Sequence, residues 1–90
     1  MPYHPPGSVL LREEIKGLID RFVAKKDAPE VERTVERAAR DAEKCNFRSA
    51  TIGLTEVLKL EEKRKIPAQL RDKAIALVEA IMAEKCGCRI

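Results

Sequence analysis

Three cysteines and one histidine are the side chains of this 90-residue chain best suited to metal binding, redox chemistry or nucleophilic attack. His4 lies in the proline-rich segment 1–7, which offers no rigid framework for a general base or a metal ligand. A tetrahedral zinc site needs four ligands, and here they would have to converge from segments far apart in the sequence. Isolated glycines also exclude a phosphate-binding loop. We therefore predict no catalytic, cofactor-binding or metal site, and a protein that is not an enzyme.

The cysteines are better suited to a structural bond. If the chain forms an up-down helical bundle, its second and fourth helices end at the same pole, which brings Cys45 close to Cys86 or Cys88. A disulfide there would close a loop of about 40 residues and stabilise the fold by roughly 3 to 4 kcal/mol. Free thiols and a metal site remain alternatives. The third cysteine of an odd set could link two chains.

A run of cations near the last interhelical turn could bind phosphates. Acidic residues at positions 61, 62 and 72 dilute its charge, so solvated helix ends are the simpler interpretation. The candidate basic patch consists of Lys63, Arg64, Lys65, Arg71 and Lys73.

Four amphipathic helices must position these residues, and no strand pattern is present. After an extended arm at 1–7, a single domain spans 8–90. Ser8, Asp27 with Glu30, and Pro67 mark helix starts, and Gly87 marks the last helix end. The predicted helices cover 8–26, 28–45, 47–64 and 67–86. The fold class is therefore all-α, as an up-down bundle or as stacked helical hairpins.

Each helix has one apolar stripe at helical spacing. We expect Gly17 to mark the close approach of a neighbouring helix. The first stripe is Leu11, Ile15, Leu18, Ile19, Phe22 and Val23; the second is Val31, Val35, Ala38, Ala39, Ala42 and Cys45. The third is Phe47, Ala50, Leu54, Val57 and Leu58; the fourth is Leu70, Ala74, Leu77, Val78, Ile81 and Met82.

Composition narrows the class of protein. Apolar residues make up 44% and charged residues 37% of the chain, which suits a folded helical domain, while 3% aromatic residues leave few stacking platforms for nucleic acids. The net charge is only +3. No apolar run is long enough for a membrane span and no signal peptide is apparent, so we expect a cytoplasmic protein. Single Asn and Gln residues among many charged ones are typical of thermophiles.

The order of residue types from Asn46 to Leu60 is similar to the second-helix signature of tetratricopeptide repeats. Segment 31–85 also resembles the microtubule-interacting and trafficking (MIT) module, a three-helix unit. The resemblance implies binding of a peptide in a groove between helices. We therefore expect a non-catalytic protein interaction module, with a nucleic-acid-binding or regulatory helical protein as the alternative. The apolar run at 9–11 indicates a homodimer contact if it is exposed.

Overall fold

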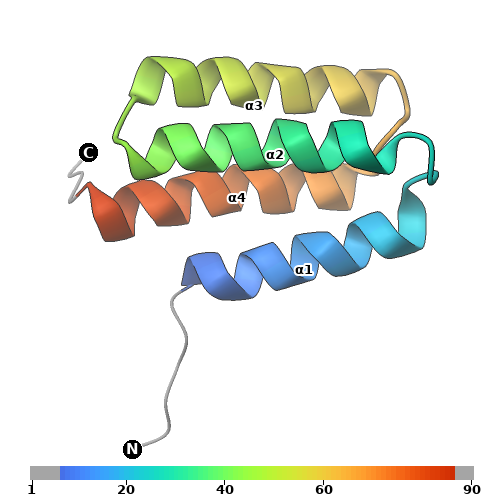
Figure 1. Ribbon diagram of the computed structural model, residues 1–90, viewed down its shortest axis with the longest axis horizontal. Coiled ribbons are helices and arrows are strands. Elements are labelled where there is room, and N and C mark those ends of the chain that lie inside the picture. The colour runs from blue at the N-terminus through green and yellow to red at the C-terminus, as the bar shows by residue number, and fades with distance from the viewer. Residues whose placement is uncertain (1–6, 87–90) are drawn as a thin grey trace, which may run out of the picture.

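The computed structural model describes residues 7–86 and contains four α-helices joined by short turns. Consecutive helices run antiparallel, so the all-α fold is an up-down bundle (Figure 1). The helices are α1 (Gly7–Phe22), α2 (Ala28–Glu43), α3 (Phe47–Glu62) and α4 (Ala68–Lys85). In the described part of the chain, no helix is both long and apolar enough to cross a membrane.

The helices do not contact one another equally. The most extensive contacts join α2 to α3 and α1 to α4, and α2 also packs on α4 through the middle of the bundle. Contacts between α1 and α2 are the sparsest of the five helix pairs, and α1 does not reach α3 within residues 7–86. The bundle is therefore two tight pairs joined along the α2–α4 line, with α1 and α3 on the outside.

Small side chains allow α2 and α3 to lie close together. Ala38, Ala39 and Ala42 of α2 are almost completely buried. A Cβ atom added to Gly53 of α3 would lie 2.7 Å from the Cβ of Ala38, too close for any real side chain. The expectation for Gly17 is wrong: a Cβ there would meet nothing within 4 Å. The close helix approach occurs at Gly53.

The buried face of α3 is rotated about the helix axis relative to the predicted apolar stripe. Ala50 and Val57 are buried as expected, but the other buried positions are Gly53 and Leu60. Leu54 is half-buried against the core, while Phe47 and Leu58 are exposed. Spacing alone could not separate these faces, because a glycine contributes no apolar signal to the stripe.

The remaining core largely follows the prediction. Phe22, at the end of α1, is 53% exposed and lies outside the core. Cys45 is also exposed, in the turn after α2. Ile66, in the turn before α4, is buried and was absent from the predicted stripes.

The helix starts differ in detail from the predicted caps. Helix α1 already begins at Gly7, and the backbone N–H and hydroxyl of Ser8 both donate to the Glu84 carboxylate of α4. Asp27 precedes α2 but makes no side-chain capping bond, and Glu30 instead accepts from Lys65. The pair of capping bonds predicted from Asp27 and Glu30 at the start of α2 is therefore absent. Asn46 does cap α3, because its side-chain oxygen accepts from the N–H of Ser49.

Two helices end in the same backbone motif. After α2, the N–H of Asn46 donates to the carbonyl of Asp41, and Cys45 has a left-handed backbone with φ of 59°. After α3, Lys65 donates to the carbonyl of Leu60, and Arg64 has the same φ. Both are Schellman turns, in which glycine usually occupies the left-handed position. These turns shorten α2 and α3 relative to the predicted ends at 45 and 64.

Candidate functional site: a groove between the first two helices

A groove opens where the helix contacts are sparsest, between α1 and α2, with α4 beneath. Its volume is about 360 Å³. Because α1 packs mainly on α4 and α2 packs mainly on α3, few contacts close the space between α1 and α2, and Leu77 of α4 lies at its base. The groove is lined by Arg12, Ile15, Lys16 and Ile19 from α1, Glu32, Val35 and Glu36 from α2, and Leu77 from α4.

The groove has an apolar floor. Ile15 and Ile19 repeat at helical spacing along α1, and both are nearly buried, as are Val35 and Leu77. All four side chains belong to the hydrophobic core, so packing across three helices holds them in place. The floor is therefore preformed and apolar, with 1 to 6% of each of these residues exposed at its surface.

The two lips carry opposite charges. Arg12 and Lys16 are four residues apart on α1, and Glu32 and Glu36 are four residues apart on α2. Arg12 spans the gap: its guanidinium lies 2.6 Å from the carboxylate of Glu36 and 2.6 Å from that of Glu43. Among residues 7–86, Lys16 and Glu32 make no ion pair. This leaves one basic and one acidic group available to a ligand.

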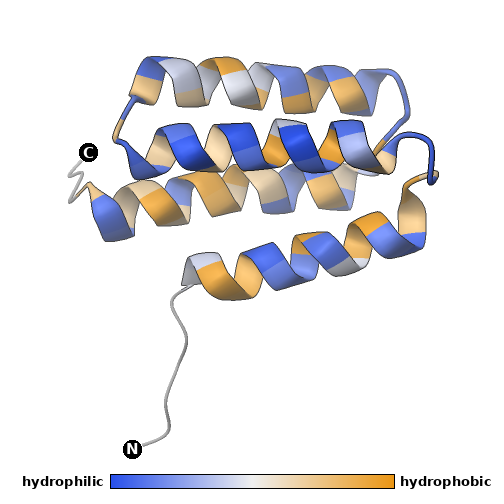
Figure 2. Ribbon diagram, in the orientation of Figure 1, coloured by the Kyte–Doolittle hydropathy of each residue, from blue (hydrophilic) through white to orange (hydrophobic). Residues whose placement is uncertain are grey.

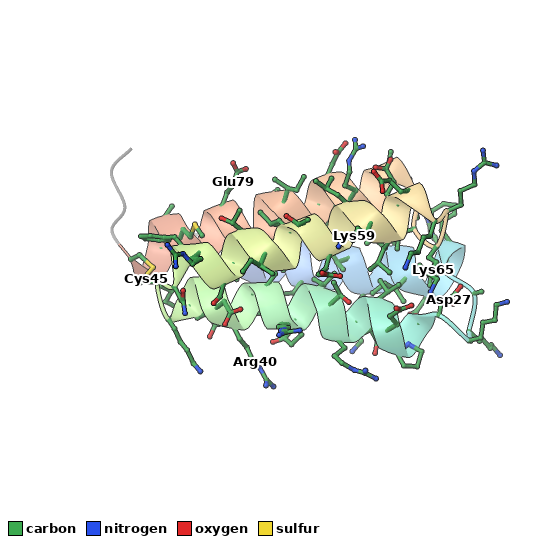
Figure 3. The ribbon with its side chains drawn as sticks, turned by 90° about the horizontal axis from the view of Figure 1, so that it is seen from above. Asp27, Arg40, Cys45, Lys59, Lys65 and Glu79 are labelled. Atoms are coloured by element: carbon green, nitrogen blue, oxygen red, sulfur yellow. A yellow bond between two sulfur atoms is a disulfide. The ribbon has the colours of Figure 1, made fainter. Side chains whose placement is uncertain are left out.

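The disulfide lies at the pole where α2 and α4 end. Cys45 is bonded to Cys86, with their Cα atoms 5.6 Å apart (Figure 3). This confirms the shared pole and selects one of the two predicted pairings. Cys88 and His4 lie outside the described residues. Within those residues, no three His, Cys, Asp or Glu side chains cluster in a way that could hold a metal ion.

Three of the five cations in the candidate basic patch are held in ion pairs. The Lys65 amine lies 2.7 Å from the Glu30 carboxylate, and Arg71 contacts Glu61 at 2.8 Å and Asp72 at 2.9 Å. Lys73 pairs with Glu14 of α1. Lys63 and Arg64 are exposed, and neither forms an ion pair within the described part of the chain. The patch is thus divided by acidic partners.

These ion pairs shift the ionisation of their members. The hydrogen bond from Lys65 lowers the pKa of Glu30 below its ordinary value of 4.5. The same bond raises the pKa of Lys65 above 10.5. Hydrogen bonds to Asp72 and Glu61 raise the pKa of Arg71 further, so it stays charged. The pairs therefore persist across the neutral pH range.

Exposed apolar side chains lie mainly on α1 and α3. Val9 and Leu10, at the start of α1, are 43% and 49% exposed, while Leu11 packs against the core. On α3, the exposed apolar residues are Phe47, Ile52 and Leu58. The run at 9–11 therefore presents two of its three side chains to solvent.

Sequence reasoning anticipated an interhelical groove but not the residues that line it. The available signal was a pair of matched spacings: two cations four residues apart in the first helix and two acids four residues apart in the second. Glu36 lies 4.0 Å from Arg40 of its own helix. Its shorter partner is Arg12 on the neighbouring helix.

Comparison of the chain with protein-family models, with curated proteins and with solved structures finds no match.

Proposed function

We propose that this protein is a non-catalytic interaction module that binds a helical segment of a partner protein in the groove between α1 and α2. The observation that carries the proposal is the apolar floor contributed by three helices and flanked by lips of opposite charge. Helix-in-groove recognition uses such a surface, because an amphipathic helix inserts apolar residues at i, i+3, i+4 and i+7 into it.

The charges on the lips specify the chemistry of that helix. Lys16 favours an acidic residue on the side facing α1, and Glu32 favours a basic residue on the side facing α2. Arg12 already forms ion pairs with Glu36 and Glu43, and these pairs link α1 to α2 across the groove. The expected ligand is therefore an apolar helix face bordered by acid on one side and base on the other.

The resemblance of residues 31–85 to tetratricopeptide and MIT modules supports the same class of function. The proposed groove is built partly from α1, which precedes that segment. The groove itself is thus the main support for the proposal, and the resemblance is secondary.

The experiment is selection of peptides from a random helical-peptide display library on the wild-type protein. Affinities of the enriched peptides are then measured for Lys16→Glu and Glu32→Lys. Each reversal should weaken binding about two- to fivefold, because an exposed ion pair contributes up to about 1 kcal/mol. Unchanged affinity for both variants would contradict the proposed groove.

Lys63→Glu is the matched control, since Lys63 is exposed in the turn between α3 and α4. It should leave peptide affinity unchanged. It also separates the alternative function, because nucleic-acid binding through the basic patch would weaken with this change and would fall steeply with added salt.

A further inference from the structure

The outer face of α3 differs from the solvated face of α2. We define it by seven exposed residues: Arg48, Thr51, Ile52, Thr55, Leu58, Lys59 and Glu62. Helix α3 contacts α2 and α4 only, so within the described residues this face has no partner. Figure 3 looks down on α3.

Helix α2 shows what a solvated face looks like in this protein. Apart from Pro29, every exposed residue of α2 is charged. On α3, by contrast, positions 49–55 contain no charged residue, and Ile52 and Leu58 are 56% and 42% exposed. The hydropathy colouring shows the contrast: α2 alternates blue and orange, whereas the first half of α3 is mainly pale or orange (Figure 2).

The two threonines add little polarity to this face, because their hydroxyl groups donate hydrogen bonds within the helix. The hydroxyl of Thr51 donates to the carbonyl of Phe47 at 2.8 Å, and that of Thr55 donates to the carbonyl of Thr51 at 3.1 Å. Both hydroxyl protons are therefore used within the helix. Lys59, one turn after Thr55, brings a charge to the middle of the face, and it pairs with Glu56 of its own helix at 3.8 Å.

The charges at its two ends identify the occupant. Arg48 lies seven residues before Thr55 and Glu62 lies seven residues after it, and within residues 7–86 neither forms an ion pair. Ile52 and Leu58 are likewise three residues before and after Thr55. A helix with this arrangement is complementary to a reversed copy of itself, which is the requirement of a two-fold interface.

We infer that a second copy of this chain docks on the outer face of α3, with the two α3 helices antiparallel and crossing at Thr55. Each Arg48 then faces Glu62 of the second copy, about 10 Å along the helix from the two-fold axis. Ile52 of one copy lies at the same level along the helix as Leu58 and Lys59 of the other. The interface does not use the groove between α1 and α2, so both grooves of the dimer remain open.

The test is a charge-swap series measured by sedimentation equilibrium over a concentration range up to about 1 mM. All proteins carry Cys88→Ser, so that a disulfide between chains cannot mimic association. Arg48→Glu alone and Glu62→Arg alone should each raise the dimer dissociation constant about tenfold, because like charges then meet twice. The double variant Arg48→Glu/Glu62→Arg should return to within about threefold of the parent protein.

Two further variants locate the interface. Thr55→Arg places two arginines at the two-fold axis and should raise the dissociation constant at least tenfold. Leu10→Lys is the matched control at the other exposed apolar site and should have no effect. A monomeric parent protein, dissociation by Leu10→Lys, or failure of the double variant to restore association would each overturn the inference.

Discussion

Lys65 and Glu30 form an ion pair between residues 35 positions apart, at the pole opposite the disulfide. In Figure 3, Lys65 and Asp27 lie at one end of the bundle and Cys45 at the other. The pair joins the start of α2 to the turn before α4, where Ile66 is buried. It therefore holds the start of α2 against the turn between α3 and α4. In the sequence, this turn is recognisable only as a break between two helices.

The pH dependence of this pair follows from its pKa shifts. Because the pKa of Glu30 is lowered on folding, its contribution to stability is present above pH 4.5 and is lost as the pH falls through the folded-state pKa. The raised pKa of Lys65 keeps its contribution below pH 10.5 and removes it at higher pH.

We therefore expect Glu30→Gln to be less stable than wild type at pH 7, with a difference that shrinks as the pH falls below 4.5. Urea denaturation of both proteins at several pH values measures this difference. Glu79→Gln serves as the control, because Glu79 is exposed and forms no ion pair among residues 7–86. A difference that grows on acidification would show that the pair is not formed.

At the scale of the helices, close packing occurs at only one of the two glycines considered, Gly17 and Gly53. The two glycines inside helices have opposite environments: Gly17 faces open space, and Gly53 lies against Ala38 of α2. The sequence alone assigned the close approach to Gly17, because an isolated glycine in a helical pattern indicates packing but does not say which face is buried.

The same substitution should consequently have opposite effects at the two sites. Gly17→Ala should stabilise the protein by about 0.5 to 1 kcal/mol through helix propensity. Gly53→Ala should destabilise it by about 1 to 3 kcal/mol, because the added methyl forces α2 and α3 apart. Chemical denaturation of both variants measures the two free energies. Destabilisation at residue 17 or stabilisation at residue 53 would mean that the helix faces are assigned incorrectly.

The number of helices and their approximate starts could be predicted from the sequence. Pro29, Asn46 and Pro67 mark helix starts through local backbone chemistry, so the number of helices follows from the chain itself. The face of α3 could not be predicted, since Phe47, Leu54 and Leu58 form a stripe as regular as the buried one. Side-chain volumes on α2 decide between them, and these act only after packing.

At the scale of the whole molecule, the disulfide joins the turn between α2 and α3 to the end of α4. It joins two residues 41 positions apart in the chain, and the loop between them contains all of α3 and α4. The number of helices and the short loops between them predicted that Cys45 and the end of α4 lie at the same pole of the bundle. It could not choose between Cys86 and Cys88, because the two lie only two residues apart at the end of a helix.

Replacing the bridge by Cys45→Ser/Cys86→Ser should lower the free energy of unfolding by about 3 to 4 kcal/mol, through the greater freedom of the unfolded chain. Both cysteines are changed so that Cys88 cannot pair with Cys45. Cys88→Ser is the control and should remain within about 0.5 kcal/mol of wild type. Equal stability of the doubly substituted and wild-type proteins in non-reducing denaturation would contradict a stabilising role for the bridge.

The central claim is that the groove between α1 and α2 binds a helix, and methyl NMR tests it most directly. Titration of a library-selected peptide into protein labelled at Ile, Leu and Val methyl groups reports each side chain separately. The account predicts that shifts concentrate on the floor of the groove at Ile15, Ile19, Val35 and Leu77, while Ile52 and Leu58 on α3 stay unchanged. Shifts confined to α3, with the four floor residues unaffected, would contradict it.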